Sequence, residues 1–157
     1  MSPAKENRST TQPRSRSSLI LLALLWALVP LTAWSQIEDL RLLRVTERVS
    51  MIMGAGSNVV VLETSDGLAL VDSGAPEQSE FLLAFIDEAF DGAPIRVLFN
   101  THWHLDNTGA NEAIAARRAA IVAHENTRLW MGTEYYVEWE RKNYLPRPDS
   151  ALPTETF

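Results

Sequence analysis

The chain has 157 residues, with 14 basic and 20 acidic side chains and no cysteine. The missing cysteines exclude disulfides and thiolate metal ligands, and the net charge of −6 disfavours nucleic acid and anionic membranes as partners. The length allows one small domain.

Residues 1–35 have the pattern of a secretory signal peptide. Four basic residues precede the apolar run 19–29, and Ala33-Trp34-Ser35 supplies the small residues of a cleavage site. The alternative is a membrane anchor, but residues 19–34 contain Pro30 and fall short of the about 20 apolar residues that a spanning helix needs. We therefore expect export to the periplasm or the medium, with no membrane attachment after cleavage. Cleavage would leave 10 basic and 19 acidic residues.

The next segment alternates between strand and helix patterns. Residues 43–45 and 49–53 alternate apolar and polar side chains, which predicts two short half-buried strands. Residues 58–64 and 68–72 are rich in β-branched and apolar residues and flank Ser65-Asp66-Gly67, a strong hairpin pattern.

Residues 77–90 have the apolar spacing of a helix with one buried face, so we expect their phenylalanines in the core. The run 95–100 is almost continuously apolar, which is typical of a strand covered on both faces. Shorter elements follow: a helix at 110–119, a strand at 120–123 and a helical turn or two at 125–131.

Two of the three histidines stand directly after the predicted strand 95–100. His102 and His104 are two positions apart, and Asp106 is two further on. In an extended segment alternate side chains share a face, so all three can meet one cation. Imidazole and carboxylate groups suit zinc, and a catalytic zinc keeps three protein ligands and an open position for water. The alternative, a polar loop with two histidines, is weakened by Asp106, by the preceding strand and by Gly109.

This motif follows the carboxyl end of a strand, where α/β sheets place their ligand sites. Trp103 and Leu105 would point away from the histidines. We expect them to pack and hold the loop rather than to touch substrate.

The stretch resembles the signature of the metallo-β-lactamase-fold hydrolases, HxHxDH at a strand end before a glycine-containing turn. The same positions here read His102-x-His104-x-Asp106-Asn107, followed by Gly109, so asparagine stands where the family usually has histidine. Val71-Asp72-Ser73-Gly74 also resembles the family's aspartate-glycine turn after a hairpin. The resemblance covers roughly residues 43–132.

The resemblance implies an α/β fold, the αββα sandwich in which two sheets pack face to face with helices outside. Residues 36–133 would form the amino-terminal half of this domain, and 134–157, with three prolines, would form a loop-rich tail. The domain would then be incomplete. Without the second sheet, the inner face of the first would stay uncovered, which favours self-association.

The resemblance also assigns roles at the site. His102 and His104 would hold the zinc that activates water, whereas Asp106 would bind a second metal or, with one zinc, orient the attacking hydroxide and take its proton. A neutral amide is a poor zinc ligand, so Asn107 makes the second of the one or two zinc sites doubtful.

Asp72 would lie close to the metals and orient a ligand or its water. From the residues alone, the alternative role of Asp72 is to cap the following helix. His124 could be a third histidine ligand or a local hydrogen-bonding group.

The resemblance thus implies an exported zinc-dependent hydrolase that acts on a small molecule through an amide, ester, lactone or related bond, β-lactams included. The alternative is an inactive half-domain that binds metal weakly or associates with a partner. The substrate, the metal count and the third histidine ligand are not determined by the sequence.

Overall fold

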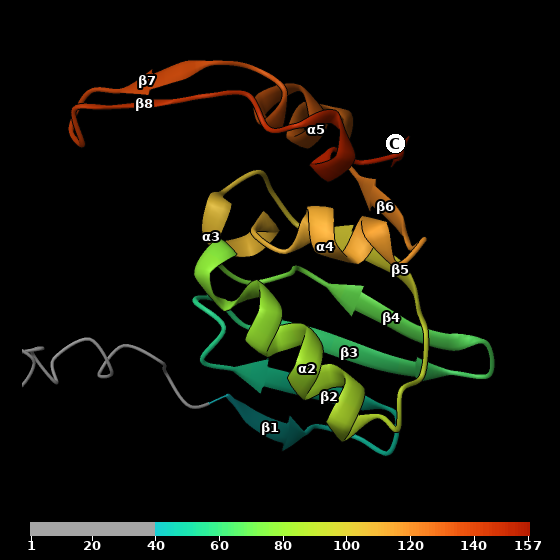
Figure 1. Cartoon of the computed structure of the whole chain (residues 1–157). Coiled ribbons are helices and arrows are strands. Elements are labelled where there is room, and N and C mark those ends of the chain that lie inside the picture. Colours follow the sequence, from blue (N-terminus) through green and yellow to red (C-terminus); the bar gives the residue numbers. More distant parts are fainter. Residues whose placement is uncertain (1–39) are drawn as a thin grey trace, which may run out of the picture. The chain divides into compact units, whose positions relative to one another are not determined.

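The structure, a computed structural model, describes residues 40–157 and is organised around a seven-stranded mixed sheet (Figure 1). The predicted signal peptide of residues 1–35 lies outside the described residues. Within the described range, no helix has the length and apolar character that crossing a membrane requires.

The first four strands pair antiparallel in chain order, as the alternating pattern predicts. They are β1 (Arg41–Arg44), β2 (Val49–Met53), β3 (Val59–Thr64) and β4 (Gly67–Val71). Ser65 and Asp66 form the turn between β3 and β4, which confirms the predicted hairpin.

The remaining strands run parallel to β4. They are β5 (Ile95–Asn100), β6 (Ala120–Ala123) and β9 (Glu155–Thr156). The link from β4 to β5 contains η3 (Pro76–Gln78) and α2 (Ser79–Ala89), and the link from β5 to β6 contains α3 (Leu105–Thr108) and α4 (Asn111–Ala116). The carboxyl ends of β4, β5 and β6 therefore meet at one edge of the sheet, where the histidine motif begins.

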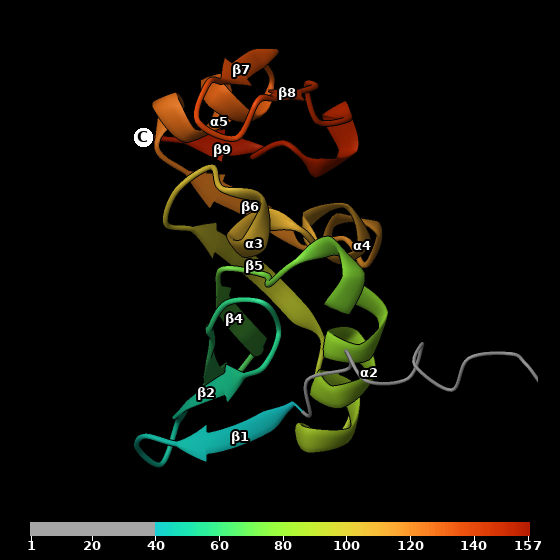
Figure 2. The same ribbon diagram turned by 90° about the vertical axis from the view of Figure 1, so that its left-hand side faces the viewer.

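Helices α2 and α4 lie on the same face of the sheet (Figures 1 and 2). Leu82 and Ile86 of α2 and Ile114 of α4 are fully buried there. Phe90 is buried as predicted, but Phe81 is 47% exposed, so the expectation of core phenylalanines throughout 77–90 is wrong at that position. The strands contribute the rest of this core through alternate side chains: Ile52, Val59, Val61, Leu68, Leu70, Leu98 and Ile121.

The other face of the sheet carries a second, more open apolar surface. The register aligns one row across five strands, from Met51 through Val60, Val71 and Phe99 to Val122. Phe99 is 42% exposed and the other four are half-buried. The prediction that strand 95–100 is covered on both faces is therefore wrong for the described residues, because the helices cover one face only.

The tail contains regular elements, contrary to the predicted loop. After α5 (Glu125–Met131), strands β7 (Tyr135–Val137) and β8 (Lys142–Tyr144) form a hairpin that extends away from the sheet in Figure 1. The short η4 (Asp149–Ala151) and β9 then return the chain to the edge of β6. The prolines stand outside these strands, where their missing N–H groups cost no ladder hydrogen bond.

Candidate metal and substrate site

Backbone hydrogen bonds hold the histidine motif against the turn after β4. The Ser73 N–H donates to the Asn107 carbonyl, and the Gly109 N–H donates to the Gly74 carbonyl, both at 2.7 Å. A Cβ at position 109 would lie 2.2 Å from the Pro76 nitrogen, which no real side chain tolerates. Gly109 is thus required by the close approach of two backbones.

Asp72 holds Thr101, the residue directly before the histidine motif. Its carboxylate accepts hydrogen bonds from the Thr101 backbone N–H at 2.8 Å and from the Thr101 hydroxyl at 2.7 Å. Asp72 is buried and has a φ of +61°, a left-handed conformation that is unusual for a residue other than glycine. The structure shows no side-chain cap at the following helix, so the capping alternative for Asp72 is wrong.

The same contacts set the tautomer of His102. Thr101 has a single hydroxyl proton, which it gives to Asp72, so the His102 Nδ1 at 2.8 Å must donate to the Thr101 oxygen. The lone pair of His102 then lies on Nε2. The Asn107 amide nitrogen lies 3.3 Å from this Nε2 and donates to it. Asp72 therefore acts through Thr101 to present the Nε2 of His102 as a ligand atom.

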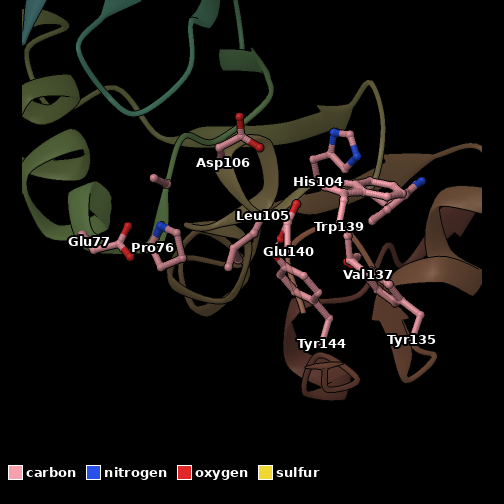
Figure 3. A pocket seen from close by; sticks show the side chains of 12 residues that line it. Pro76, Glu77, His104, Leu105, Asp106, Tyr135, Val137, Trp139, Glu140 and Tyr144 are labelled. Carbon is pink, nitrogen blue, oxygen red and sulfur yellow. Dashed lines mark hydrogen bonds between the residues drawn. The ribbon is translucent and has the colours of Figure 1, made fainter. Parts of the chain in front are cut away.

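His104 lies beside His102, with ring centroids 4.7 Å apart. Asp106, however, is in the first turn of α3, and its carboxylate lies apart from His104 in Figure 3. Among residues 40–157, no group of three or more His, Asp and Glu side chains is placed to hold one metal ion. The structure brings the two imidazoles together, and the assignment of Asp106 as a metal ligand stays a prediction.

A buried amide network lies behind the motif. The Asn111 carbonyl oxygen accepts from the Ser73 hydroxyl at 2.9 Å and from the Asn100 amide at 3.1 Å. Its amide nitrogen donates to the Asn100 oxygen at 2.8 Å and to the Ala151 carbonyl at 3.0 Å. All polar groups of this side chain are paired, so the network fixes the ends of β4 and β5 beneath the motif.

His124 serves a local role. Its Nδ1 accepts a hydrogen bond of 3.1 Å from the Asn126 N–H at the start of α5. The structure thus shows the local hydrogen-bonding role, one of the two alternatives for His124, and places it in no metal-ligating group among the described residues.

A cavity of about 490 Å³ opens beside the motif. Trp103, His104 and Leu105 all line it, so the expectation that Trp103 and Leu105 point away from the histidines is wrong. The reason is that β5 ends at Asn100 and the backbone bends at 101–102, so the strand-like alternation does not continue through the motif. That these two side chains do not touch substrate stays a prediction. Figure 3 shows Pro76 and Glu77 at one end and the β7–β8 hairpin at the other.

The hairpin side chains of this wall were missed from sequence. They are Tyr135, Val137, Trp139, Glu140 and Tyr144. Tyr135, Tyr136 and Val137 have side chains that favour strands, and this short run is the signal that could have revealed the first strand of the hairpin.

The model of the metallo-β-lactamase superfamily matches residues 53–157, which is most of the chain. The chain belongs to the metallo-β-lactamase superfamily. Its mixed α/β sheet with helices on one face is the corresponding fold, which confirms the predicted fold class. None of the curated proteins matches the sequence.

Several solved metallo-β-lactamases share this fold. One from Pontibacter korlensis is 24% identical, with a TM-score of 0.55 over 76% of this chain and 53% of that one. One from Cronobacter sakazakii, described by a HARLDQ motif, is 23% identical, with a TM-score of 0.60 over 73% and 47%. A subclass B3 enzyme of Bradyrhizobium japonicum is 22% identical, with a TM-score of 0.55 over 76% and 47%. The chain thus spans about half the length of these superfamily structures.

The residues of this site supply part of a zinc ligand set. The oriented Nε2 of His102 and the adjacent ring of His104 are suitable ligands, because neutral imidazole nitrogen binds zinc well. A third ligand is not gathered within residues 40–157. The described part of the chain therefore supplies an incomplete ligand set.

Proposed function

We propose that this chain is the amino-terminal half of an exported zinc-dependent hydrolase that acts on a small molecule. The reaction class is attack of water on an amide, ester, lactone or related bond, β-lactams included. The observation that carries the proposal is a pair of adjacent imidazoles, of which His102 is oriented by its hydrogen bonds and His104 lines a cavity large enough for a drug-sized ligand. Export rests on the signal-peptide pattern of residues 1–35.

In this proposal His102 and His104 hold one zinc, and residues from the other half of the fold complete its ligand set. When bound, zinc would act as a Lewis acid and lower the pKa of its bound water to about 7. Asp106 binds a second metal or orients the attacking water.

Asn107 argues for weak binding at the second site, because its amide is a poor zinc ligand. The HARLDQ motif named for the Cronobacter sakazakii structure likewise ends in an amide residue, glutamine. An uncharged amide residue at the sixth position of the motif therefore also occurs in one of the solved structures.

The proposal is tested by zinc binding to the 157-residue chain, measured by competition with a chromogenic chelator. We expect binding that His102→Ala/His104→Ala abolishes. The matched control is His124→Ala, which removes the remaining histidine and should keep zinc affinity because His124 only caps α5. Equal zinc binding in all three proteins would contradict the assignment. Hydrolysis of a chromogenic β-lactam or of p-nitrophenyl acetate, with and without chelator, then tests turnover.

The open sheet face favours a second candidate function. A half-domain with a continuous apolar row from Met51 to Val122 has a surface suited to association with another copy or with a partner. In this candidate the chain does not turn over substrate, and association does not depend on zinc.

A further inference from the structure

The cavity beside the motif has two walls of different origin. The turn after β4 and the motif form one, with Pro76, Glu77 and residues 103–106, and the β7–β8 hairpin forms the other. Its volume of about 490 Å³ lies within the range of small-molecule sites. The cavity therefore has room for a ligand that extends from the motif toward the hairpin.

Four aromatic side chains line this cavity: Trp103, Tyr135, Trp139 and Tyr144. Trp103 is held in place, because it stacks on Trp130 at 5.5 Å between centroids and meets Tyr135 edge-on at 5.0 Å. Tyr135 in turn stacks on Tyr144 at 5.1 Å. Trp139 is 86% exposed, so its ring is free to contact a ligand. The hairpin end of the cavity is thus an aromatic wall that is mostly fixed.

The charged side chains that line the cavity are all acidic. Glu77, Asp106 and Glu140 line the cavity, and no lysine or arginine is among its lining residues within 40–157. Glu140 is fixed at the aromatic wall, because it accepts a hydrogen bond of 2.7 Å from the Tyr144 hydroxyl. A negatively charged ligand would meet three carboxylates, and no positively charged lining residue among 40–157 would pair with it.

Two further observations describe the charges at the hairpin end. The pKa of Tyr144 is raised above its ordinary value, first by the hydrogen bond to Glu140 and then by burial and by the charges of Glu140 and Asp106, although Arg147 opposes the shift. The ammonium of Lys142 lies over the Tyr144 ring, 4.5 Å from its centroid, and Tyr135 stacks on the same ring. The faces of Tyr144 are thus already in contact with other side chains, whereas the ring of Trp139 is exposed.

We propose that this cavity selects ligands that carry an ammonium group beside an apolar body, and that it discriminates against ligands that carry a carboxylate. The ammonium would lie near Glu140 and the exposed ring of Trp139, where cation–π attraction and the carboxylate act together. The apolar body would contact Trp103 and Leu105. As a statement about substrate, this inference rests on the proposed hydrolase function, because it names the substrate class of that site. Within that function it favours amines among the amides, esters and lactones, and it disfavours β-lactams that carry a free carboxylate.

The test compares three probes that share a phenyl group and differ in charge: 2-phenylethylammonium, 2-phenylethanol and 3-phenylpropanoate. Binding to the 157-residue chain is followed by tryptophan fluorescence with chelator present, so that no metal contributes. We expect the ammonium to bind about tenfold or more tightly than the carboxylate, with the alcohol between them. Equal affinities, or tighter binding of the carboxylate, would overturn the inference.

Variants that remove a charge test whether Glu140 causes the preference for the ammonium probe. Glu140→Gln should weaken binding of the ammonium several-fold and leave the alcohol unchanged. Glu88→Gln is the matched control, since Glu88 is exposed on α2 and outside the cavity, and it should change neither. Equal losses in both variants would mean that net charge, not this cavity, attracts the probe.

This outcome is separable from that of the hydrolase proposal. The probes report on binding without metal, so a chain that lacks zinc affinity and turnover can still show the ammonium preference. Conversely, zinc-dependent turnover without that preference would overturn this inference alone.

Discussion

Leu98 and Phe99 are neighbours on β5 that belong to two different faces of the sheet. Leu98 is fully buried beneath the helices, whereas Phe99 lies on the open face and is 42% exposed. Both faces are apolar, so side-chain character does not distinguish them. The difference is made by what covers each face, because α2 and α4 complete a core on one side only.

The largest expected effect contrasts these two residues. Leu98→Ala should lower the free energy of unfolding by about 2–5 kcal/mol, because it leaves a cavity in a packed core. Phe99→Ala should cost clearly less, since its ring already contacts solvent. Urea unfolding followed by circular dichroism measures both. Equal losses would mean that the open face is covered in solution.

Gly109 tests how closely the histidine motif packs against the turn after β4. Gly109→Ala should cost about 1–3 kcal/mol, because its Cβ would overlap the backbone at Pro76 and force a shift. Gly132→Ala is the control, since a Cβ there meets its nearest atom at 3.4 Å. Thermal unfolding of the two variants gives the comparison, and similar melting temperatures would contradict the close approach.

The open face predicts self-association. Val60→Thr/Phe99→Thr reduces the apolar area of the open face at two positions of its row, on β3 and β5, so we expect the dimer dissociation constant of the chain to rise roughly tenfold. Sedimentation equilibrium measures it. The control Phe81→Thr changes an exposed phenylalanine of α2 and should leave the constant unchanged. A monomeric wild-type chain would refute association through this face.

The smallest effect concerns the ion pair that joins the two covering helices. Arg117 donates to Asp87 at 2.6 and 2.8 Å, and this hydrogen bond lowers the pKa of Asp87 below its ordinary 3.8. The stabilisation is therefore present above pH 3.8 and is lost as the pH falls through the lowered value. Asp87→Asn should cost about 0.2–1 kcal/mol at pH 7, because the pair is solvent-exposed. The cost should shrink in urea unfolding near pH 3, and a constant difference would contradict the linkage.

Periodicity predicted most elements of the sheet because each strand alternates and α2 has one apolar stripe. It did not predict which faces are covered, since the apolar residues of β5 look alike whether one or two layers pack on them. The hairpin at 135–144 was missed because nearby prolines suggested a loop, although they stand outside its strands.

At the site, sequence located the histidine pair and the carboxylate of Asp72. The role of Thr101 could not be predicted from sequence. It arises because Asp72, 29 positions away in the chain, accepts hydrogen bonds from both the backbone N–H and the hydroxyl of Thr101. The direction of Trp103 was predicted wrongly because alternation was assumed beyond the end of β5 at Asn100.

The amide of Asn111 bears on where this folding unit can be cut. It donates to the carbonyl of Ala151, beyond the hairpin and 40 positions later, while its oxygen serves Ser73 and Asn100. Ending the chain at residue 133 would strip one partner from a fully buried amide and uncover the groups beneath the motif. Residues 149–156 are therefore part of the folded domain, and the support of the histidine motif depends on a segment that the sequence predicts to be a loop-rich tail.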